Sequence, residues 1–435
     1  TSGVNPLSHI MVESIIDLDQ THPSIYMRMP ADPPKEWVQL AGRYLIEGKN
    51  RAQMLNDPAV TEALRGYGLT AEDASTYTCG GCMEVTPQGM NSDLLFSGWH
   101  NVAKTVELVL TGGVCLKTGD RWDAAGLGPL GAYDGFDAMY EAFERELERE
   151  LKILFGRYDL YSEAMAEHRP LFLMSSMTAD CLERGRELHD GGARYHHYGS
   201  SPLGIPNAAD ALYAVKQAVF DEAICSAEEL FEAMRSNFED REALRLRLRA
   251  LPKYGRQHPD ADAMMARVLA SVCDVYESHR NRLGGRIKPV VLTFVWAPIA
   301  GGALGATADG QFAGTPVAHG LTPQNAGLSE GVTAAIGSCT SLPLSKVSGG
   351  ASTMWDLDHQ WGTPEVSEHL LTTFLDMGGH IFQGNTTDVE ELIRAREDPR
   401  SHPHVLVRVG GYSARFVTLA PELQEEIITR HRHRT

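Results

Sequence analysis

The chain has 435 residues, of which 43% are hydrophobic and 22% are charged, and its formal net charge is −18. A chain of this length can bury a core of normal size, and it allows roughly three domains or one unusually large one. Acidic residues outnumber basic ones by 57 to 39. This balance argues against nucleic-acid binding, which needs a basic face, and the ordinary apolar content argues against disorder.

The cysteines and the first residues bear on the cellular compartment. Seven cysteines are scattered along the chain, and an odd number without framework spacing is typical of a protein in a reducing cytoplasm. The chain begins Thr1-Ser2-Gly3, with neither an initiator Met nor a signal-peptide pattern, so we expect part of a longer cytoplasmic protein. The longest uncharged apolar stretch, 289–308, contains Pro298 and several glycines, so we expect no membrane-spanning helix.

Helical and strand-like patterns alternate along the chain. Apolar residues recur with the period of one-sided helices at 35–48, 136–158, 208–224, 227–238 and 364–377. Short apolar runs between them indicate buried strands at 171–174, 290–296, 380–383 and 405–409. The alternation predicts an α/β fold, and the absence of a linker or repeat favours one large domain.

The segment 77–85 does not resemble an ordinary helix or strand. Gly80 and Gly81 permit a sharp loop, from which Cys82 and Glu84 project in the same direction if the loop is extended. A thiol and a carboxylate would then face a common pocket. A lone cysteine is more often a small buried apolar residue, and that alternative remains open at this point.

A metal site is the second alternative for this segment. Cys79-x-x-Cys82 has the spacing of half a zinc site, but no second pair of suitable spacing follows it. His196 and His197 are adjacent, so on a strand their side chains face opposite ways. We therefore expect no bound metal.

A second unusual segment lies near the C-terminus, at 405–416. A strand pattern leads into Gly410-Gly411, and a helical pattern resumes near 421–428. A plain glycine turn would account for the two glycines. The flanking Arg408, Tyr412 and Ser413 are large or polar for a simple exposed turn.

Together the two segments resemble the signatures of the glycyl radical enzymes. The run 408–414, RVGGYSA, is similar to their C-terminal radical motif RVxGYSA, and the run 80–84, GGCME, contains their cysteine-loop motif GCxE. Cys82 and Gly411 are 329 positions apart (411 − 82), close to the family spacing. Shorter similar segments lie between them, at 5–8, 191–195, 207–210, 305–310 and 378–383, so the resemblance covers essentially the whole chain.

The resemblance implies a fold and a domain division. The family fold is a ten-stranded α/β barrel of two halves, with a cysteine finger loop and a glycine loop meeting inside. This chain corresponds to the second half, with barrel residues at 1–300 and the glycine radical domain at 301–435. We expect it to need the missing N-terminal half-barrel or a complementing segment, and to be homo-oligomeric when complete.

The resemblance also implies roles for particular residues. Gly411 would store an unpaired electron on its Cα, and Cys82 would become a transient thiyl radical that takes hydrogen from the substrate. Arg408, Tyr412 and Ser413 would support the radical loop. Because the cysteine acts by radical chemistry, it does not need the depressed thiolate pKa of nucleophilic cysteines.

Glu84 points to the eliminating branch of the family. Pyruvate formate-lyases carry two adjacent cysteines, whereas here Met83 follows Cys82. A carboxylate at position 84 would act as a general base while a neighbouring group leaves, as in dehydratases and lyases acting on small hydroxylated substrates. Arylacetate decarboxylases share this cysteine and glutamate, so decarboxylation remains an alternative, as does a non-catalytic spare radical domain.

The departures from the family pattern concern the substrate. Tyr195, His196 and His197 stand where many relatives carry Tyr-Asn-Phe, so they are candidate substrate-binding residues or satisfied polar residues. The resemblance implies no bound cofactor. It implies a separate radical S-adenosylmethionine activating enzyme as partner, and anaerobic metabolism because oxygen destroys the radical.

Overall fold

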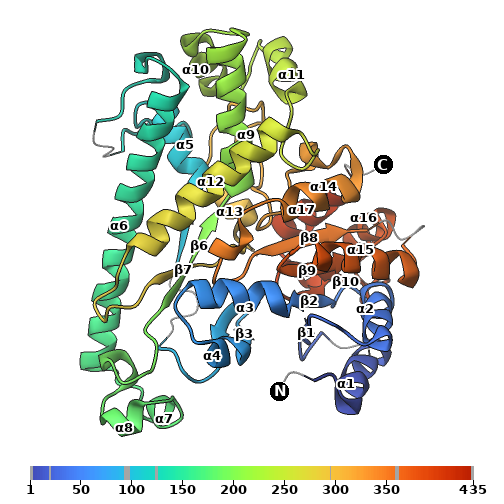
Figure 1. Ribbon diagram of the computed structural model, residues 1–435. Coiled ribbons are helices and arrows are strands. Elements are labelled where there is room, and N and C mark those ends of the chain that lie inside the picture. The colour runs from blue at the N-terminus through green and yellow to red at the C-terminus, as the bar shows by residue number, and fades with distance from the viewer. Residues whose placement is uncertain are drawn as a thin grey trace.

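The computed structural model describes residues 3–18, 21–92, 98–122, 126–293, 295–357 and 362–432. Its helices and strands alternate along the chain (Figure 1). The helices are α1 Pro6–Asp17, α2 Lys35–Glu47, α3 Asp57–Gly66, α4 Ala71–Ser75, α5 Val102–Leu110, α6 Phe136–His168, α7 Phe172–Ser176, α8 Cys181–Arg184, α9 Ile205–Val215, α10 Ala227–Arg235, α11 Glu242–Ala250, α12 Pro259–Ser278, α13 Trp296–Gly302, α14 Gly331–Thr340, α15 Pro364–Asp376, α16 Val389–Glu397 and α17 Pro421–Arg432. The strands are β1 Met27–Met29, β2 Gln53–Asn56, β3 Tyr77–Gly80, β4 Glu84–Pro87, β5 Trp99–Asn101, β6 Tyr198–Leu203, β7 Ile287–Pro289, β8 Ser352–Asp356, β9 Ile381–Asn385, β10 Leu406–Arg408 and β11 Ser413–Arg415. The prediction of an α/β fold is confirmed.

Two sheets carry the scaffold. In one sheet β5, β6 and β7 run parallel, in that order. In the other, the order is β1-β2-β9-β8, where β8 is parallel and β2 antiparallel to β9. An isolated parallel bridge between Val291 and Ala351 connects the edges of the two sheets.

Helices cover these strands and form the main core. Helix α9 is buried along its whole length, and it packs against α5 and α12. Its alanines allow this close packing, since small side chains let neighbouring helices approach. The 33-residue helix α6 runs along one side of the molecule and buries one face against α5 and α12 (Figure 1). In the described part of the chain, no helix is long and apolar enough to span a membrane.

Two predicted strands are wrong. Residues 171–174 belong mostly to the short helix α7, where Phe172 and Leu173 are exposed rather than buried. Residues 290–293 are buried but do not continue the strand: β7 ends at Pro289, the N–H of Leu292 bonds back to the carbonyl of Val290, and α13 begins at Trp296. A short apolar run does not reveal by itself whether it lies in a strand, a helix or a loop, which explains both errors. Phe294, within the second run, lies outside the described residues.

The other predicted elements are present with shifted ends. The helices predicted at 35–48 and 364–377 are α2 and α15, and the strands at 380–383 and 405–409 are β9 and β10. Helix α6 continues ten residues beyond the predicted end, to His168. The helix predicted at 208–224 is α9 followed by a π-helical segment, Lys216–Asp221. All seven cysteines are free thiols.

Candidate active site

The cysteine loop is the turn of a β-hairpin. Strands β3 and β4 pair antiparallel, with Gly80 opposite Glu84, so residues 81–83 form the turn. Gly81 has φ +60°, and a Cβ there would lie 2.9 Å from a carboxylate oxygen of Glu84. Glycine is therefore needed at position 81 both for the backbone conformation and for space. Cys82 lies half-buried at the tip.

The carboxylate of Glu84 bends back over the turn. Its Oε2 accepts hydrogen bonds from the backbone N–H groups of Cys82, at 2.7 Å, and Met83, at 2.9 Å. The side chain is 5% exposed. The structure thus brings Glu84 and Cys82 together, and the carboxylate also fixes the backbone of the loop that carries the thiol.

The thiol of Cys82 keeps its proton at neutral pH. Burial raises its pKa to about 12, and the negative charge of Glu84 adds to this rise, while Arg408 opposes it. The hydroxyl of Tyr26 donates a 2.6 Å hydrogen bond to the carbonyl of Cys82 and anchors the tip from the other side. The site therefore presents an S–H group, which can give a hydrogen atom, instead of a thiolate.

The glycine loop is the turn between β10 and β11. Arg408 pairs with Ser413 across the antiparallel strands, and Gly410 and Gly411 have φ of +149° and +74°. Both values lie where side chains other than glycine are disfavoured. The N–H of Gly411 donates a 2.9 Å hydrogen bond to Oε1 of Gln383 on β9, and Gly411 is buried.

Arg408 is a buried cation beneath this loop. It is 1% exposed, and burial lowers its pKa to about 10. Its guanidinium donates to Oε1 of Gln383 at 2.9 Å, to Oγ of Ser413 at 3.3 Å and to Oε1 of Gln53. A buried charge is tolerated when its donors are satisfied in this way. Arg408 and Ser413, which we expect to support the loop, are hydrogen-bonded to each other beside it.

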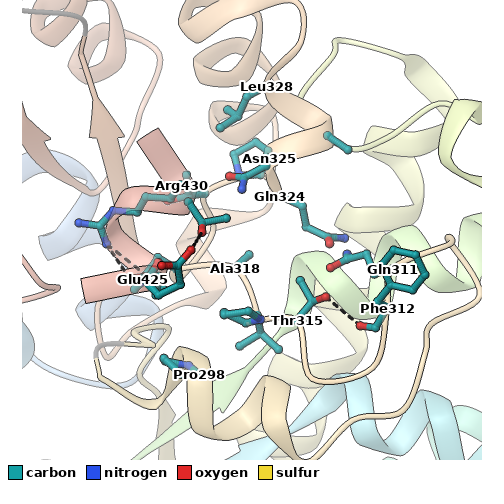
Figure 2. Close-up of a pocket in the computed structure, with 18 of the residues that line it drawn as sticks. Pro298, Gln311, Phe312, Thr315, Ala318, Gln324, Asn325, Leu328, Glu425 and Arg430 are labelled. Atoms are coloured by element: carbon teal, nitrogen blue, oxygen red, sulfur yellow. Dashed lines mark hydrogen bonds and ion pairs between the residues drawn. The ribbon is translucent and has the colours of Figure 1, made fainter. Parts of the chain in front are cut away.

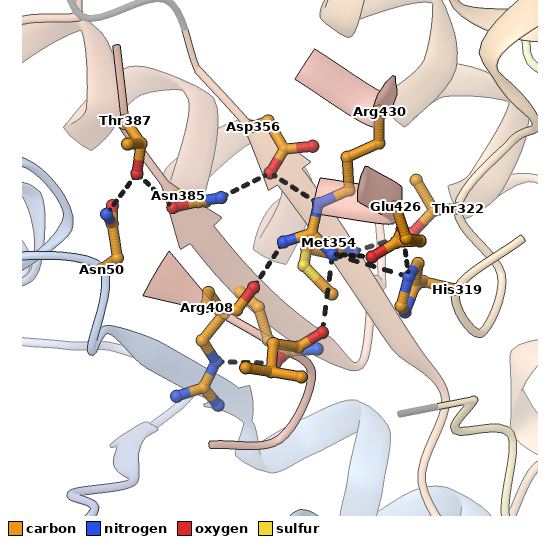
Figure 3. Close-up of polar contacts among 12 residues, drawn as sticks. Asn50, His319, Thr322, Met354, Asp356, Asn385, Thr387, Arg408, Glu426 and Arg430 are labelled. Atoms are coloured by element: carbon orange, nitrogen blue, oxygen red, sulfur yellow. Dashed lines mark hydrogen bonds and ion pairs between the residues drawn. The ribbon is translucent and has the colours of Figure 1, made fainter. Parts of the chain in front are cut away.

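Helix α17 reinforces the strand that leads into the glycine loop (Figure 3). Arg430 donates hydrogen bonds to the backbone carbonyls of Arg408 and Val409. Its guanidinium also lies within 3.6 Å of Asp356 and 3.5 Å of Glu426, and Glu426 pairs with His319 at 2.9 Å. Strand β10 and the glycine loop are therefore held both by Gln383 on β9 and by Arg430 on α17.

The cysteine and glycine loops meet along β9. Met83 and Val85 pack in one apolar cluster with Ile381, at the start of β9, while Gln383, two residues further, holds Gly411. Loops from opposite ends of the sequence are thus brought to one strand.

The three candidate substrate-binding residues lie elsewhere around the hairpin. Tyr195 donates a 2.7 Å hydrogen bond to Asp73 and stacks on His197, with ring centroids 5.7 Å apart. His196 bonds to Ser92, and His197 accepts from the N–H of Arg286. Burial lowers the pKa of His196 to about 4 and of His197 to about 3, so both imidazoles are neutral near pH 7. A substrate role for these three residues stays a prediction.

A large cavity lies beside α17, which contributes Glu425 and Arg430 to its lining (Figure 2). Its volume is about 1000 Å³, and its lining includes Gln311, Phe312, Asn325 and Arg430. Cys82, Glu84 and Gly411 are not among the lining residues. The cavity therefore adjoins Arg430, which holds the strand before the glycine loop, and it is not lined by Cys82, Glu84 or Gly411.

Two family models match the chain. Residues 1–297 match the model described as pyruvate formate lyase-like, and residues 317–417 match the glycine radical model. The chain belongs to the glycyl radical, pyruvate formate lyase-like family. The glycine radical match includes Gly411 and Gln383, and the first match includes Cys82 and Glu84.

Several relatives of this chain are dehydratases, and others are isethionate sulfite-lyases or a 4-hydroxyphenylacetate decarboxylase subunit. The chain is 28% identical to trans-4-hydroxy-L-proline dehydratase of Clostridioides difficile over 98% of its own length and 54% of the relative's. It is 26% identical to (2S)-3-sulfopropanediol dehydratase of Klebsiella oxytoca, covering 98% and 53%. The glycerol-bound B12-independent glycerol dehydratase of Clostridium butyricum superposes with a TM-score of 0.92 at 28% identity, covering 98% and 54%. The chain thus spans about half the length of these relatives.

The sequence analysis missed several residues that position the two loops. Tyr26, Gln53 and Arg430 were not singled out, and Gln383 was noted within a similar segment without a role. One signal was available for Gln383, since a polar residue inside an otherwise apolar strand needs a partner when buried. Tyr26 and Arg430 are far in sequence from the loops they hold, and no local pattern marks them.

Proposed function

We propose that the chain is the catalytic C-terminal portion of a glycyl radical lyase that eliminates water from a small hydroxylated substrate. Gly411 stores the radical, Cys82 relays it and Glu84 is the general base. The observation that carries the proposal is the meeting of the cysteine and glycine loops along β9, with a protonated thiol at Cys82. The dehydratase names of the relatives support the choice of reaction.

The proposed reaction conserves one unpaired electron throughout. The Gly411 radical takes the hydrogen atom of the Cys82 thiol, and the thiyl radical then takes hydrogen from a substrate carbon that bears a hydroxyl. Glu84 accepts the proton of this hydroxyl, and the hydroxyl on the neighbouring carbon leaves as water with a proton from the solvent, to which Glu84 later releases its own. The product radical takes a hydrogen atom from the Cys82 thiol, and the thiyl radical formed takes one from Gly411, which restores the Gly411 radical.

Two further parts of the proposal concern what surrounds this chain. We infer that β5, β6, β7, β8 and β9 form the second half of a ten-stranded barrel, supported by the Val291–Ala351 bridge between the two sheets. A complementing segment would supply the first half, and the chain is then inactive without it. A separate radical S-adenosylmethionine activating enzyme would install the radical in the anaerobic cytoplasm.

Electron paramagnetic resonance after anaerobic activation of the complemented protein tests the radical assignment. We expect a doublet signal in the unaltered protein and in Cys82→Ser, and none in Gly411→Ala. Cys82→Ser should lose all turnover, whereas the matched variant Cys79→Ser, in the same hairpin, should keep it. A doublet that survives Gly411→Ala, or turnover that survives Cys82→Ser, would contradict the proposal.

Glu84→Gln tests the general base separately. Glutamine keeps an oxygen for the N–H groups of Cys82 and Met83 but cannot accept a proton. Turnover should fall by roughly 100-fold or more while the doublet remains, because general base catalysis typically contributes that much. With the vicinal diols glycerol and 1,2-propanediol as substrates, elimination yields a product that retains every carbon. Release of carbon dioxide from an arylacetate would instead show the decarboxylase alternative.

A further inference from the structure

Three potential metal ligands converge on the surface of the radical domain, away from the two loops. Glu391 lies on α16, and His402 and His404 lie in the segment between α16 and β10. One ligand atom from each side chain lies within 4.8 Å of the other two. Glu391 and His402 are half-buried, and His404 is exposed.

A surface ion pair explains only part of this cluster. His404 Nε2 lies 3.5 Å from Glu391 Oε1, and an exposed pair of this kind contributes little to stability. His402 is not part of that pair, although its Nδ1 is buried and has no hydrogen-bond partner. A buried polar atom without a partner costs free energy, and a bound cation would remove that cost.

The spacing and the donor types fit a transition metal. Metal–ligand bonds of 2.0–2.1 Å in a tetrahedral site place the ligand atoms about 3.3 Å apart. The distance between His404 and Glu391 is already close to this value, and small side-chain rotations bring His402 in. Two imidazoles and one carboxylate suit zinc and its neighbours, whereas magnesium and calcium prefer oxygen ligands alone.

The backbone around the cluster is fixed. Arg415 donates a 2.7 Å hydrogen bond to the carbonyl of Pro403, the residue between the two histidines. Ser401, next to His402, donates to the carboxylate of Asp398 at 2.6 Å. Side-chain hydrogen bonds therefore hold the segment that carries both histidines.

We propose that Glu391, His402 and His404 bind one divalent transition-metal ion such as zinc, with water completing the coordination. The ion would join α16 to the segment that enters β10, a few residues before Arg408 (Figure 1). It would thus hold together the two elements that lead into the glycine loop without contacting Cys82, Glu84 or Gly411. The proposal is independent of the proposed lyase function, and its test needs no radical.

Metal content measured after equilibrium dialysis against zinc tests the site. We expect one zinc ion per chain, with binding weakened by more than about 100-fold in His402→Asn, since losing a ligand costs more than losing one of its outer partners. His404→Asn should weaken binding similarly, and because His404 is exposed this variant is not expected to disturb folding. Magnesium and calcium at the same concentration should not compete.

A matched control is available on α6. His168 is exposed beside Glu167, at 3.8 Å, and among the described residues this pair belongs to no group of three metal ligands. His168→Asn should leave zinc binding unchanged. Zinc that is retained in both His402→Asn and His404→Asn, or lost in Cys82→Ala, would overturn the assignment and place the ion at the cysteine loop or elsewhere.

Discussion

At the scale of single residues, Gln383 connects three parts of the site through one side chain. Its carbonyl oxygen accepts from both the N–H of Gly411 and the guanidinium of Arg408, each at 2.9 Å, and its amide donates to Ser352 at 2.6 Å. All four residues are buried. One amide therefore connects the glycine loop, the buried cation and the neighbouring strand β8.

Gln383→Leu should destabilise the protein by roughly 3 kcal/mol or more. Leucine has a similar volume but leaves several buried polar groups without a partner, one of them on a cation. Urea unfolding measures the change. Gln424→Leu is the control, because that half-exposed amide donates one 3.0 Å bond to Phe416 and its loss should cost about 1 kcal/mol. Equal losses in the two variants would contradict the role given to Gln383.

At the scale of elements, the contact between α17 and β10 holds the glycine loop in register. Strand β10 has three residues and pairs with β11 alone in its sheet, so its own ladder is short. Arg430 adds hydrogen bonds to the carbonyls of Arg408 and Val409, which the ladder does not satisfy. Helix α17 thus supplies backbone hydrogen bonds that a further strand would otherwise provide.

Arg430→Met should reduce stability by about 3–5 kcal/mol, the usual cost of removing one partner from a buried ionic network. Arg396→Met is the matched control, because Arg396 pairs with Glu425 on the same helix but in a more exposed position. Its effect should stay within about 1 kcal/mol. Chemical denaturation of both variants provides the comparison, and a small effect at Arg430 would show that the network does not stabilise the loop.

At the scale of the whole molecule, the segment from α16 to α17, which carries the glycine loop, has its own core. The cluster of Val405, Val407, Phe416, Ile427 and Ile428 is separate from the main core, which extends from α1 to β9. Polar contacts join the two parts: Asn50 donates to the carbonyl of Leu406 at 2.7 Å and accepts through its own carbonyl from Ser413. A separate core with a polar boundary favours opening as a unit.

Hydrogen exchange should reveal this opening. Amides of β10, β11 and α17 should exchange at least about ten-fold faster than those of α9 and α12, because local opening costs less than global unfolding. Mass spectrometry of the exchanging protein under native conditions measures both regions at once. Equal protection in the two regions would show that the segment from α16 to α17 unfolds together with the main core.

The sequence predicted the backbone of the two loops better than their surroundings. Gly80, Gly81, Cys82 and Glu84 form the predicted sharp loop, and Gly410-Gly411 is the predicted turn after a strand. These features are local, since positive φ values demand glycine within a few residues of the reactive group. The segments 171–174 and 290–296 were misjudged because short apolar runs carry no information about their partners.

By itself, the sequence determined the α/β class, the two loops and the family, since each depends on local pattern or on motif order. The tertiary structure alone decided that Gln383 and Arg430 hold the glycine loop and that Tyr26 anchors the cysteine loop. It also decided that Glu391 meets His402 and His404. Each of these contacts depends on the packing of separate elements, and such long-range contacts leave no periodic or local trace in the chain.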